Sequence, residues 1–232
     1  MKSFYTREIM MVPFEEEEKP DERLQPSVSS VIPVLGCLET DYYQWIASQV
    51  IEHARGPEKT VYLWVSSPGG YAMGLSFLLD TIQIVRANGV KVYALVPDYA
   101  LSAAYWIASA CDAIVTASDA AVGGIGTYIE AYEDSAWLKQ LGVVKYVFEA
   151  ESSPDKVLDL LSEDDRSYLQ NKVNESGLQF VEAVATGRSV PVETVITDFG
   201  KGQPVRASEA LAKKMIDSNN LIGFLLNNGE EV

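Results

Sequence analysis

Along residues 31–117, short apolar runs alternate with segments of helical periodicity, and this alternation is the feature that most constrains the fold. The runs are rich in β-branched and aromatic residues, and the segments between them place apolar residues three or four positions apart. The predicted strands are residues 31–35, 61–65, 90–96 and 113–117, and the predicted helices are residues 40–55, 71–87 and 102–110. Nearly continuous apolar strands are typical of parallel sheets covered on both faces. The sequence therefore predicts an α/β fold of stacked βαβ units with a mostly parallel sheet and flanking helices.

The second half of the chain has a less regular pattern. Asp165 follows Ser162 by three positions, a spacing that resembles a capping box and predicts a long helix from Ser162 to about Thr186. We also expect a helix near residues 134–141, a strand at residues 143–148 and a short helix that begins near Ser208. One domain is predicted over residues 31–217, between a flexible acidic N-terminal arm (residues 1–30) and a C-terminal tail (residues 218–232).

Composition excludes several classes of function. The 232 residues include 33 acidic and 18 basic side chains, which gives a net charge of −15 at pH 7. Because phosphate groups are bound by clustered Lys and Arg, the lack of such a cluster argues against a nucleic-acid binder and a polybasic membrane anchor. No apolar run approaches the ~20 residues that span a bilayer, and no signal-peptide pattern opens the sequence. We therefore expect a cytoplasmic protein with no membrane span.

The two cysteines and the single histidine argue against a metal site. Cys37 and Cys111 lack the spacing of zinc ligands, and we expect both to be reduced and buried. His53 is expected as a partly exposed side chain near the end of a helix. The scarcity of histidine also disfavours a Ser-His catalytic triad. The sequence thus indicates neither a metal nor another cofactor.

Two turns rich in small residues each follow a predicted strand and precede a predicted helix. In Ser67-Pro68-Gly69-Gly70, backbone N–H groups lie unobstructed beside the positive end of a helix dipole, where they can stabilise an anion or an oxyanion. A tight turn that needs positive φ explains the same residues. In the second turn, Ser102 stands at a helix start, where its hydroxyl can act as a nucleophile and Ala103 N–H can join an oxyanion hole. The simpler alternative is that Ser102 caps the helix.

These turns and the sequence around them resemble the S49 peptidases. This family comprises the signal peptide peptidase A group and the phage prohead proteases, and it has the ClpP/crotonase fold. The similarity is carried by residues 65–70, 100–112, 122–126, 135–143 and 180–185 together with Arg188, and weaker similarity continues to Asp217. Because consecutive parallel strands end at the same edge of a sheet, we also expect the two turns to meet in space.

The resemblance implies roles for particular residues. Ser102 matches the nucleophile, and the N–H groups of Gly70 and Ala103 match the oxyanion donors. Gly69 and Gly124 fall at positions that bind substrate. No metal ligand is implied.

The general base implied by the resemblance is a lysine just past the strand that follows the glycine-rich turn. Lys156 fits this position, and Lys145 is the rival, although it lies inside the predicted strand. Two features depart from the family pattern. Gly124 stands where family members commonly have a serine that helps to orient the lysine, and a longer segment, residues 149–155, replaces the usual short approach to the lysine that contains glycine. This segment ends in a carboxylate, Asp155, directly before Lys156.

By resemblance, the chain is expected to be a serine endopeptidase with a Ser–Lys dyad that cleaves a polypeptide substrate as a homo-oligomer. The pattern at residues 135–143 favours a phage-type protease that matures scaffold or capsid proteins in the host cytoplasm or the prohead. Three alternatives stay open. The chain could be a cytoplasmic signal-peptide peptidase, a catalytically silent ring-forming homologue, or a crotonase-type enzyme that uses the same oxyanion turns on an acyl-CoA thioester.

Overall fold

A seven-stranded sheet forms the centre of the computed structural model, which describes residues 31–57, 59–153 and 155–227. The N-terminal arm predicted over residues 1–30 lies outside the described residues. The strand order is β5-β3-β2-β4-β6-β7, with β1 also paired to β2, and only the β6–β7 pairing is antiparallel among the described strands. The strands are β1 (Val31–Leu38), β2 (Thr60–Gly70), β3 (Lys91–Val96), β4 (Tyr99–Leu101), β5 (Ala113–Thr116), β6 (Ala121–Gly123) and β7 (Pro204–Arg206). The predicted α/β fold is confirmed, and it is consistent with a ClpP/crotonase-like architecture.

The long strand β2 connects two halves of this sheet. Its first half pairs with β3, for example Val61 with Val92, and its second half pairs with β4 through Ser67 and Ala100. Residues 97–98 connect β3 to β4. β3 pairs with β5 on its other side, whereas β4 pairs with β6. The sheet therefore curls, and the end of β2 meets the end of β4 where α3 begins.

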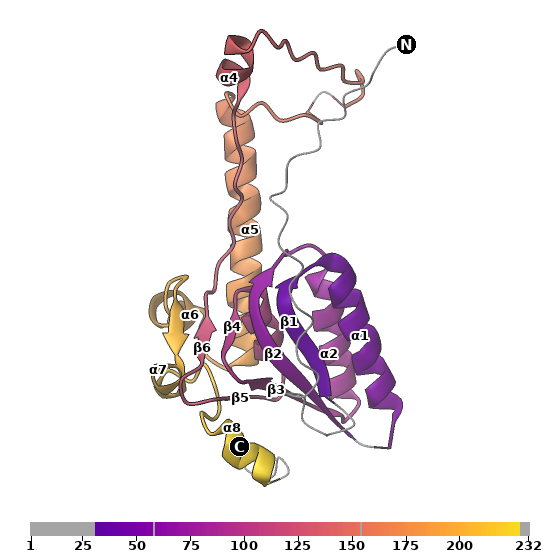
Figure 1. Cartoon of the computed structure of the whole chain (residues 1–232), viewed down its shortest axis with the longest axis vertical. Helices are drawn as coiled ribbons and strands as arrows, with labels where there is room; N and C mark the ends of the chain where they lie inside the picture. Colours follow the sequence, from indigo (N-terminus) through magenta and orange to yellow (C-terminus); the bar gives the residue numbers. More distant parts are fainter. Residues whose placement is uncertain (1–30, 58, 154, 228–232) are drawn as a thin grey trace.

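Eight helices of the described chain flank the sheet or extend from it. α1 (Thr40–Arg55) and α2 (Leu75–Ala87) lie side by side and cover one face of the sheet (Figure 1). Their buried residues recur every three or four positions, as the sequence pattern predicts: Tyr43, Ile46, Ala47 and Val50 in α1, and Leu75, Leu78, Ile82 and Val85 in α2. The other helices are α3 (Ala103–Ser109), α4 (Ser135–Gln140), α5 (Glu163–Gly187), α6 (Val192–Asp198), α7 (Ala207–Ala212) and α8 (Leu221–Leu226).

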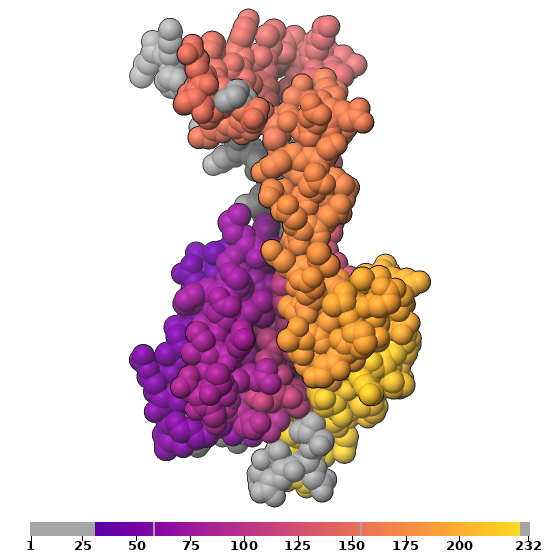
Figure 2. Space-filling view, turned by 180° about the vertical axis from the view of Figure 1, so that it is seen from behind, coloured from indigo at the N-terminus to yellow at the C-terminus, as the bar shows by residue number. Residues whose placement is uncertain are grey.

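The long helix α5 is anchored only by its last turns. Its buried residues are Phe180, Val184 and Ala185, and the Phe180 ring stacks on Trp106 of α3 with ring centroids 4.4 Å apart. The rest of α5 projects from the sheet, with α4 and the segment between α4 and α5 at its far end (Figure 1). Figure 2 shows the same projection as a column above the body that broadens at its tip. We call residues 127–179, which form this projection, the extension.

The prediction of a strand at residues 143–148 is wrong. These residues have no regular secondary structure and lie in the extension, where most of their apolar side chains are exposed, Phe148 at 93%. A β-rich sequence forms a strand only where a neighbouring strand accepts its hydrogen bonds, and no described strand lies beside this segment. The sequence pattern also missed α6, which buries only Val195 and so carries little periodic signal.

The segment predicted to be a C-terminal tail contains α8. Its Leu221 and Phe224 are buried and form a small apolar cluster with Leu95 of β3 and Val115 of β5. This cluster covers part of the sheet that α1 and α2 leave open. Among the described residues, no helix combines the length and apolar character that a bilayer crossing needs.

Candidate active site

The two small-residue turns lie in direct contact. A Cβ atom placed on Gly69 would lie 2.7 Å from Ser102 Cβ and 2.9 Å from Ala103 N, so a side chain cannot occupy this position. Gly69 also has φ +100°, a conformation that L side chains rarely adopt. Both the contact and the backbone conformation therefore require glycine. The predicted meeting of the turns at one edge of the parallel sheet is confirmed.

Ser102 has a strained backbone at the junction of β4 and α3. Its φ of 50° and ψ of −126° lie in a region that non-glycine residues rarely occupy. The conformation is held by two backbone hydrogen bonds, in which Ser102 N–H donates to Gly123 O at 2.8 Å and Trp106 N–H donates to Ser102 O at 3.0 Å. A sharp, strained turn from strand to helix is the geometry of a nucleophile elbow.

The Ser102 hydroxyl does not cap α3. Within the described chain, this side chain makes no cap hydrogen bond, and it is only half-buried. A serine kept for capping would instead accept a hydrogen bond from the first turn of the helix. The capping explanation for Ser102 is therefore wrong, and its hydroxyl is left accessible beside the glycine turn.

Buried residues of α3 hold the strained turn in place. Ala103, Ala104, Ile107 and Ala108 are buried in the main core. Tyr105 is fully buried, and its hydroxyl donates to Met215 O at 2.8 Å, with burial raising the pKa of this phenol. The packing compensates for backbone strain that an exposed turn would relax.

Two hydrogen bonds hold the end of β2 on either side of Gly70. Gly69 N–H donates to Ser67 Oγ at 3.0 Å, and Tyr71 N–H donates to Leu38 O of β1 at 2.9 Å. These two hydrogen bonds hold the backbone on either side of Gly70, which directly follows the glycine in contact with the Ser102 turn. A Cβ on Gly70 would lie only 2.0 Å from Leu38 O, so this position also requires glycine.

Gly124 lies against the backbone of the serine turn. It has φ +62°, and a Cβ placed on it would lie 3.3 Å from Ser102 N. Its neighbour Gly123 supplies the carbonyl that accepts the Ser102 N–H. The structure thus brings Ser102, Ala103, Gly69, Gly70 and Gly124 together.

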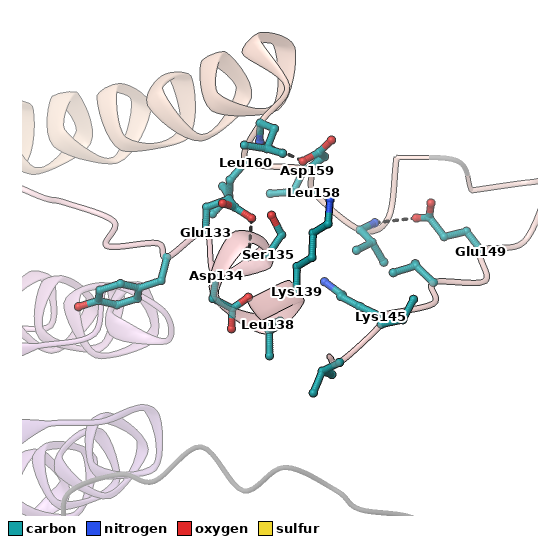
Figure 3. A pocket seen from close by; sticks show the side chains of 16 residues that line it. Glu133, Asp134, Ser135, Leu138, Lys139, Lys145, Glu149, Leu158, Asp159 and Leu160 are labelled. Atoms are coloured by element: carbon teal, nitrogen blue, oxygen red, sulfur yellow. Dashed lines mark hydrogen bonds between the residues drawn. The ribbon is translucent and has the colours of Figure 1, made fainter. Parts of the chain in front are cut away.

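Neither candidate lysine lies with this group. Lys145 and Lys156 belong to the segment at the far end of α5, whereas Ser102 lies between β4 and α3 in the body (Figure 1). The side chain of Lys156 is exposed, and the backbone N–H of Lys156 donates to Ser153 O at 3.4 Å. Lys145 points with Lys139 into an open cavity of about 670 Å³ at the tip of the extension, opposite Asp159 (Figure 3). Within one chain, the structure does not join either lysine to Ser102.

Sequence reasoning missed two hydrogen bonds that fix the loop after Gly70. The hydroxyl of the buried Tyr43 donates to Tyr71 O at 2.8 Å, and Thr40 Oγ1 donates to Met73 O at 3.0 Å. Both donors lie on α1, about thirty positions earlier in the chain, so no local pattern could reveal them. They anchor the loop backbone while the side chains of Tyr71 and Met73 remain exposed beside the site.

The cysteines differ in burial. Cys111 is free and buried as predicted, and burial raises the pKa of its thiol to about 12. Cys37 is free but exposed, so its predicted burial is wrong. The buried side chains of β1 are those of Ile32, Val34 and Leu38, at every second position, so Cys37 lies in the outward-facing phase of the strand. Among the described residues, no three His, Cys, Asp or Glu side chains are arranged to hold a metal.

The fold and the site together define a ClpP/crotonase-like protein with an accessible serine on a strained turn between glycine backbones. The sequence profile of peptidase family S49 matches residues 85–230, and the chain belongs to this family.

Three relatives illustrate the range of this similarity. Protease 4 of Haemophilus influenzae is 26% identical over 183 residues, which cover 78% of this chain and 29% of that protein. Head-tail preconnector protein GP5 of Enterobacteria phage P21 is 31% identical over 169 residues, 71% of this chain and 34% of that protein. The chloroplastic serine protease SPPA of Arabidopsis thaliana is 26% identical over 201 residues, 82% of this chain and 29% of that protein. The chain therefore spans about a third of the length of each relative.

Proposed function

We propose that the chain is a serine endopeptidase in which Ser102 is the nucleophile. The observation that carries the proposal is the strained turn at Ser102, whose hydroxyl caps nothing and whose backbone lies against Gly69 and Gly124. Strain of this kind persists where the surrounding structure enforces it, and it concentrates at catalytic positions. The N–H groups of Gly70 and Ala103 are the proposed oxyanion donors, and Gly69 and Gly124 form the adjoining wall of the substrate site.

The proposed reaction uses a neutral lysine as the base. The lysine amine takes the proton of Ser102 while Ser102 Oγ attacks the peptide carbonyl carbon, and the carbonyl oxygen becomes an oxyanion held by Gly70 and Ala103 N–H. Collapse of this intermediate breaks the C–N bond, and the lysine ammonium gives its proton to the departing amine. Water, deprotonated by the lysine, then hydrolyses the acyl-enzyme and restores Ser102.

We assign the base to Lys156 of a second copy of the chain. Support comes from the extension, which holds Lys156 away from Ser102 of its own chain and exposes large apolar side chains, including Tyr146 at 77% and Phe148. Large apolar side chains exposed together in one segment are typical of an interface between subunits. In a ring or dome, the extension of one copy would lie against the body of the next and complete its active site.

The proposed biological role is the processing of scaffold or capsid proteins by a phage-type protease. The similarity to the phage P21 preconnector protein supports this role, as does the resemblance at residues 135–143. A signal-peptide peptidase and a catalytically silent ring protein are the rival outcomes. Cleavage of a scaffold protein but not of signal peptides would support the proposed role, and the reverse pattern would contradict it.

Labelling with a fluorophosphonate probe tests the nucleophile directly. We expect the assembled wild-type protein to be labelled and the Ser102→Ala variant to be unlabelled, because the probe bonds to an activated serine oxygen. Ser118→Ala is a matched control, since Ser118 is an exposed serine and its loss should leave labelling unchanged. A wild-type assembly that takes up no probe would favour the silent homologue.

Substitution of the two lysines tests the base. We expect Lys156→Ala to lower kcat at least about a thousandfold, because loss of the proton acceptor leaves the serine unactivated, and Lys145→Ala to have a small effect. The wild-type rate should rise with pH between pH 6 and pH 9, since only the neutral amine accepts the proton. A flat pH profile, or a larger loss in Lys145→Ala, would contradict the assignment.

A further inference from the structure

Ser67 is a buried polar residue beside the active site that the proposed reaction does not use. It lies on β2, is fully buried, and is flanked in sequence by half-buried and exposed residues. Its hydroxyl makes two hydrogen bonds, donating to Gly36 O of β1 at 2.7 Å and accepting from Gly69 N–H at 3.0 Å. A buried hydroxyl that donates one hydrogen bond and accepts another is a rigid connection between the groups that it joins.

The two groups joined by Ser67 lie on either side of an irregularity in the sheet. β1 and β2 pair Leu35 with Ser66 and then Cys37 with Gly69, so one residue of β1 faces two residues of β2. The second of those two is Pro68, which has no N–H to leave unpaired. The Ser67 hydroxyl bridges the strands at this point by connecting the Gly36 carbonyl to the Gly69 amide.

This bridge fixes the chain at one end of the segment that carries the Gly70 N–H. Gly69 is held at φ +100° against Ser102, and glycine by itself can rotate freely between several backbone conformations. The hydrogen bond to Ser67 Oγ fixes the peptide before Gly69, and the hydrogen bond from Tyr71 N–H to Leu38 O fixes the peptide after Gly70, so the Gly69–Gly70 peptide is held between two anchors. Loss of the Ser67 bridge removes the first anchor and leaves the Gly69–Gly70 peptide, with its Gly70 N–H, free to turn.

We propose that Ser67 is the positioning residue of the oxyanion site. This inference rests on the proposed function, because it assumes that Gly70 N–H binds the oxyanion. Ser67 touches neither the substrate nor the reacting atoms, and it acts through Gly69 on the direction of the Gly70 N–H. Its loss should therefore weaken the transition state without weakening ground-state substrate binding.

Steady-state kinetics of Ser67→Ala and Ser66→Ala test the proposal. Ser66 precedes Ser67 on the same strand, but its hydroxyl bonds Asp98 Oδ2 at 2.7 Å, away from the glycine turn, so Ser66→Ala is the matched control. Loss of one oxyanion donor costs about 100- to 1000-fold in kcat, and a donor that is only misdirected should cost about 10- to 100-fold. We expect this loss in Ser67→Ala with KM changed less than about twofold, and wild-type kinetics in Ser66→Ala.

A peptide aldehyde inhibitor separates positioning from general damage. The aldehyde forms a tetrahedral adduct with the serine, so its inhibition constant should rise in Ser67→Ala by about the same factor as kcat falls. The affinity of a product peptide, which carries no oxyanion, should stay unchanged. If Ser67→Ala does not fold, Ser67→Cys replaces it, because the thiol keeps the volume and forms only weak hydrogen bonds.

Amide hydrogen exchange gives a readout that does not depend on activity. In the assembled wild-type protein, the Gly69 amide should be protected by Ser67, and in Ser67→Ala or Ser67→Cys it should exchange at least about tenfold faster. The Tyr71 amide, bonded to Leu38 O, should keep its protection in every variant. Unchanged kcat or unchanged Gly69 exchange in a folded variant would overturn the positioning role. A different outcome is that the wild-type protein hydrolyses no peptide while the Gly69 amide still loses its protection in the Ser67 variants. That result would overturn the proposed function but would support the hydrogen-bond bridge through Ser67.

Discussion

At the scale of single residues, the site is defined by close backbone contacts. The turn at Ser102 lies so near to Gly69 and Gly124 that it leaves little room for a side chain at either position. Gly69 and Gly124 have positive φ, and a Cβ atom on either would approach the Ser102 turn. The lack of a side chain at Gly124, which departs from the family pattern, therefore has a local steric reason. In this chain, the backbone of Gly124 packs against the Ser102 turn, where the family pattern has a serine side chain.

Restoring the family serine at this position should harm the site. Gly124→Ser forces an L residue into φ +62° with its Cβ 3.3 Å from Ser102 N, and positive φ costs about 1–2 kcal/mol for such a residue. We expect a lower melting temperature and slower fluorophosphonate labelling of Ser102. Gly126→Ser is the control, because a Cβ on Gly126 meets no atom within 4 Å. Faster labelling in Gly124→Ser would show that the hydroxyl matters more than the strain.

The glycine and serine turns could be predicted from sequence, whereas the position of the lysine could not. Gly69, Gly70 and Ser102 follow neighbouring parallel strands, and the rule that such strands end at one edge places them together. Lys156 follows no strand of the sheet, and its position depends on where α5 carries the preceding segment. That direction depends on the packing of the last turns of α5 on α3 and α6, including the stacking of Phe180 on Trp106, and contacts between such distant parts of the chain are encoded by no local pattern.

The same distinction applies at the scale of elements. Long apolar runs such as 61–65 were predicted correctly, because burial on both faces leaves a clear pattern in the sequence. β4 and β6 have only three residues each, too few for a pattern to emerge, and they exist because β2 and β7 supply partners for them.

An ion pair joins the end of α5 to the chain after α7. It is formed by Arg188 and Asp217, which the resemblance singled out, at 2.8 Å, and the Arg188 side chain is only 6% exposed.

Asp112 joins three elements of the body. Its carboxylate accepts a hydrogen bond from Val92 N–H of β3 at 2.9 Å and pairs with Arg86 of α2 at 3.1 Å and with Lys91 at 3.3 Å. Burial by itself would raise the pKa of Asp112, but these hydrogen bonds and charges outweigh it, and the pKa is lowered from its ordinary value. The ionised carboxylate therefore stabilises the fold.

Replacement of this carboxylate should change the acid stability of the protein. Since the folded-state pKa is lowered, the contribution of Asp112 is fully present above its ordinary pKa of 3.8 and is lost as the pH falls below it. We expect Asp112→Asn to lower the free energy of unfolding at pH 7 by about 1–3 kcal/mol. The difference from wild type should shrink between pH 4 and pH 2 in urea titrations. Asp119→Asn, at an exposed site, is the control, and a difference that stays constant with pH would contradict the prediction.

The extension dominates the molecule at the largest scale. α5 has 25 residues, about 37 Å of helix at 1.5 Å per residue, and its buried side chains all lie in its last turns. The remainder has no core of its own, and residues such as Tyr128, Tyr146 and Phe148 are exposed along it or at its tip. A surface of this composition is stabilised when another copy covers it.

Mixing two inactive variants tests whether one active site draws on two copies. Ser102→Ala chains keep Lys156, and Lys156→Ala chains keep Ser102, so a mixed assembly contains sites with both groups intact. If Lys156 acts on the neighbouring copy, co-assembly in equal amounts should restore about a quarter of the wild-type kcat, because one neighbour pair in four has the required composition. Ser102→Ala mixed with the Ser102→Ala, Lys156→Ala double variant should remain inactive. If the two variants assemble together but activity is not restored, Ser102 and Lys156 must act within one copy.

The length of α5 also makes the proposed enzyme sensitive to its own concentration. A chain that carries its base at one end of α5 and its nucleophile near the other end is latent when dilute, because neither group has its counterpart within reach. The rate should then climb more steeply than linearly with total protein until association is complete, and become proportional to it beyond that point. Such a protease would need no propeptide or inhibitor to delay its action, since the accumulation of its own subunits would time the first cleavage.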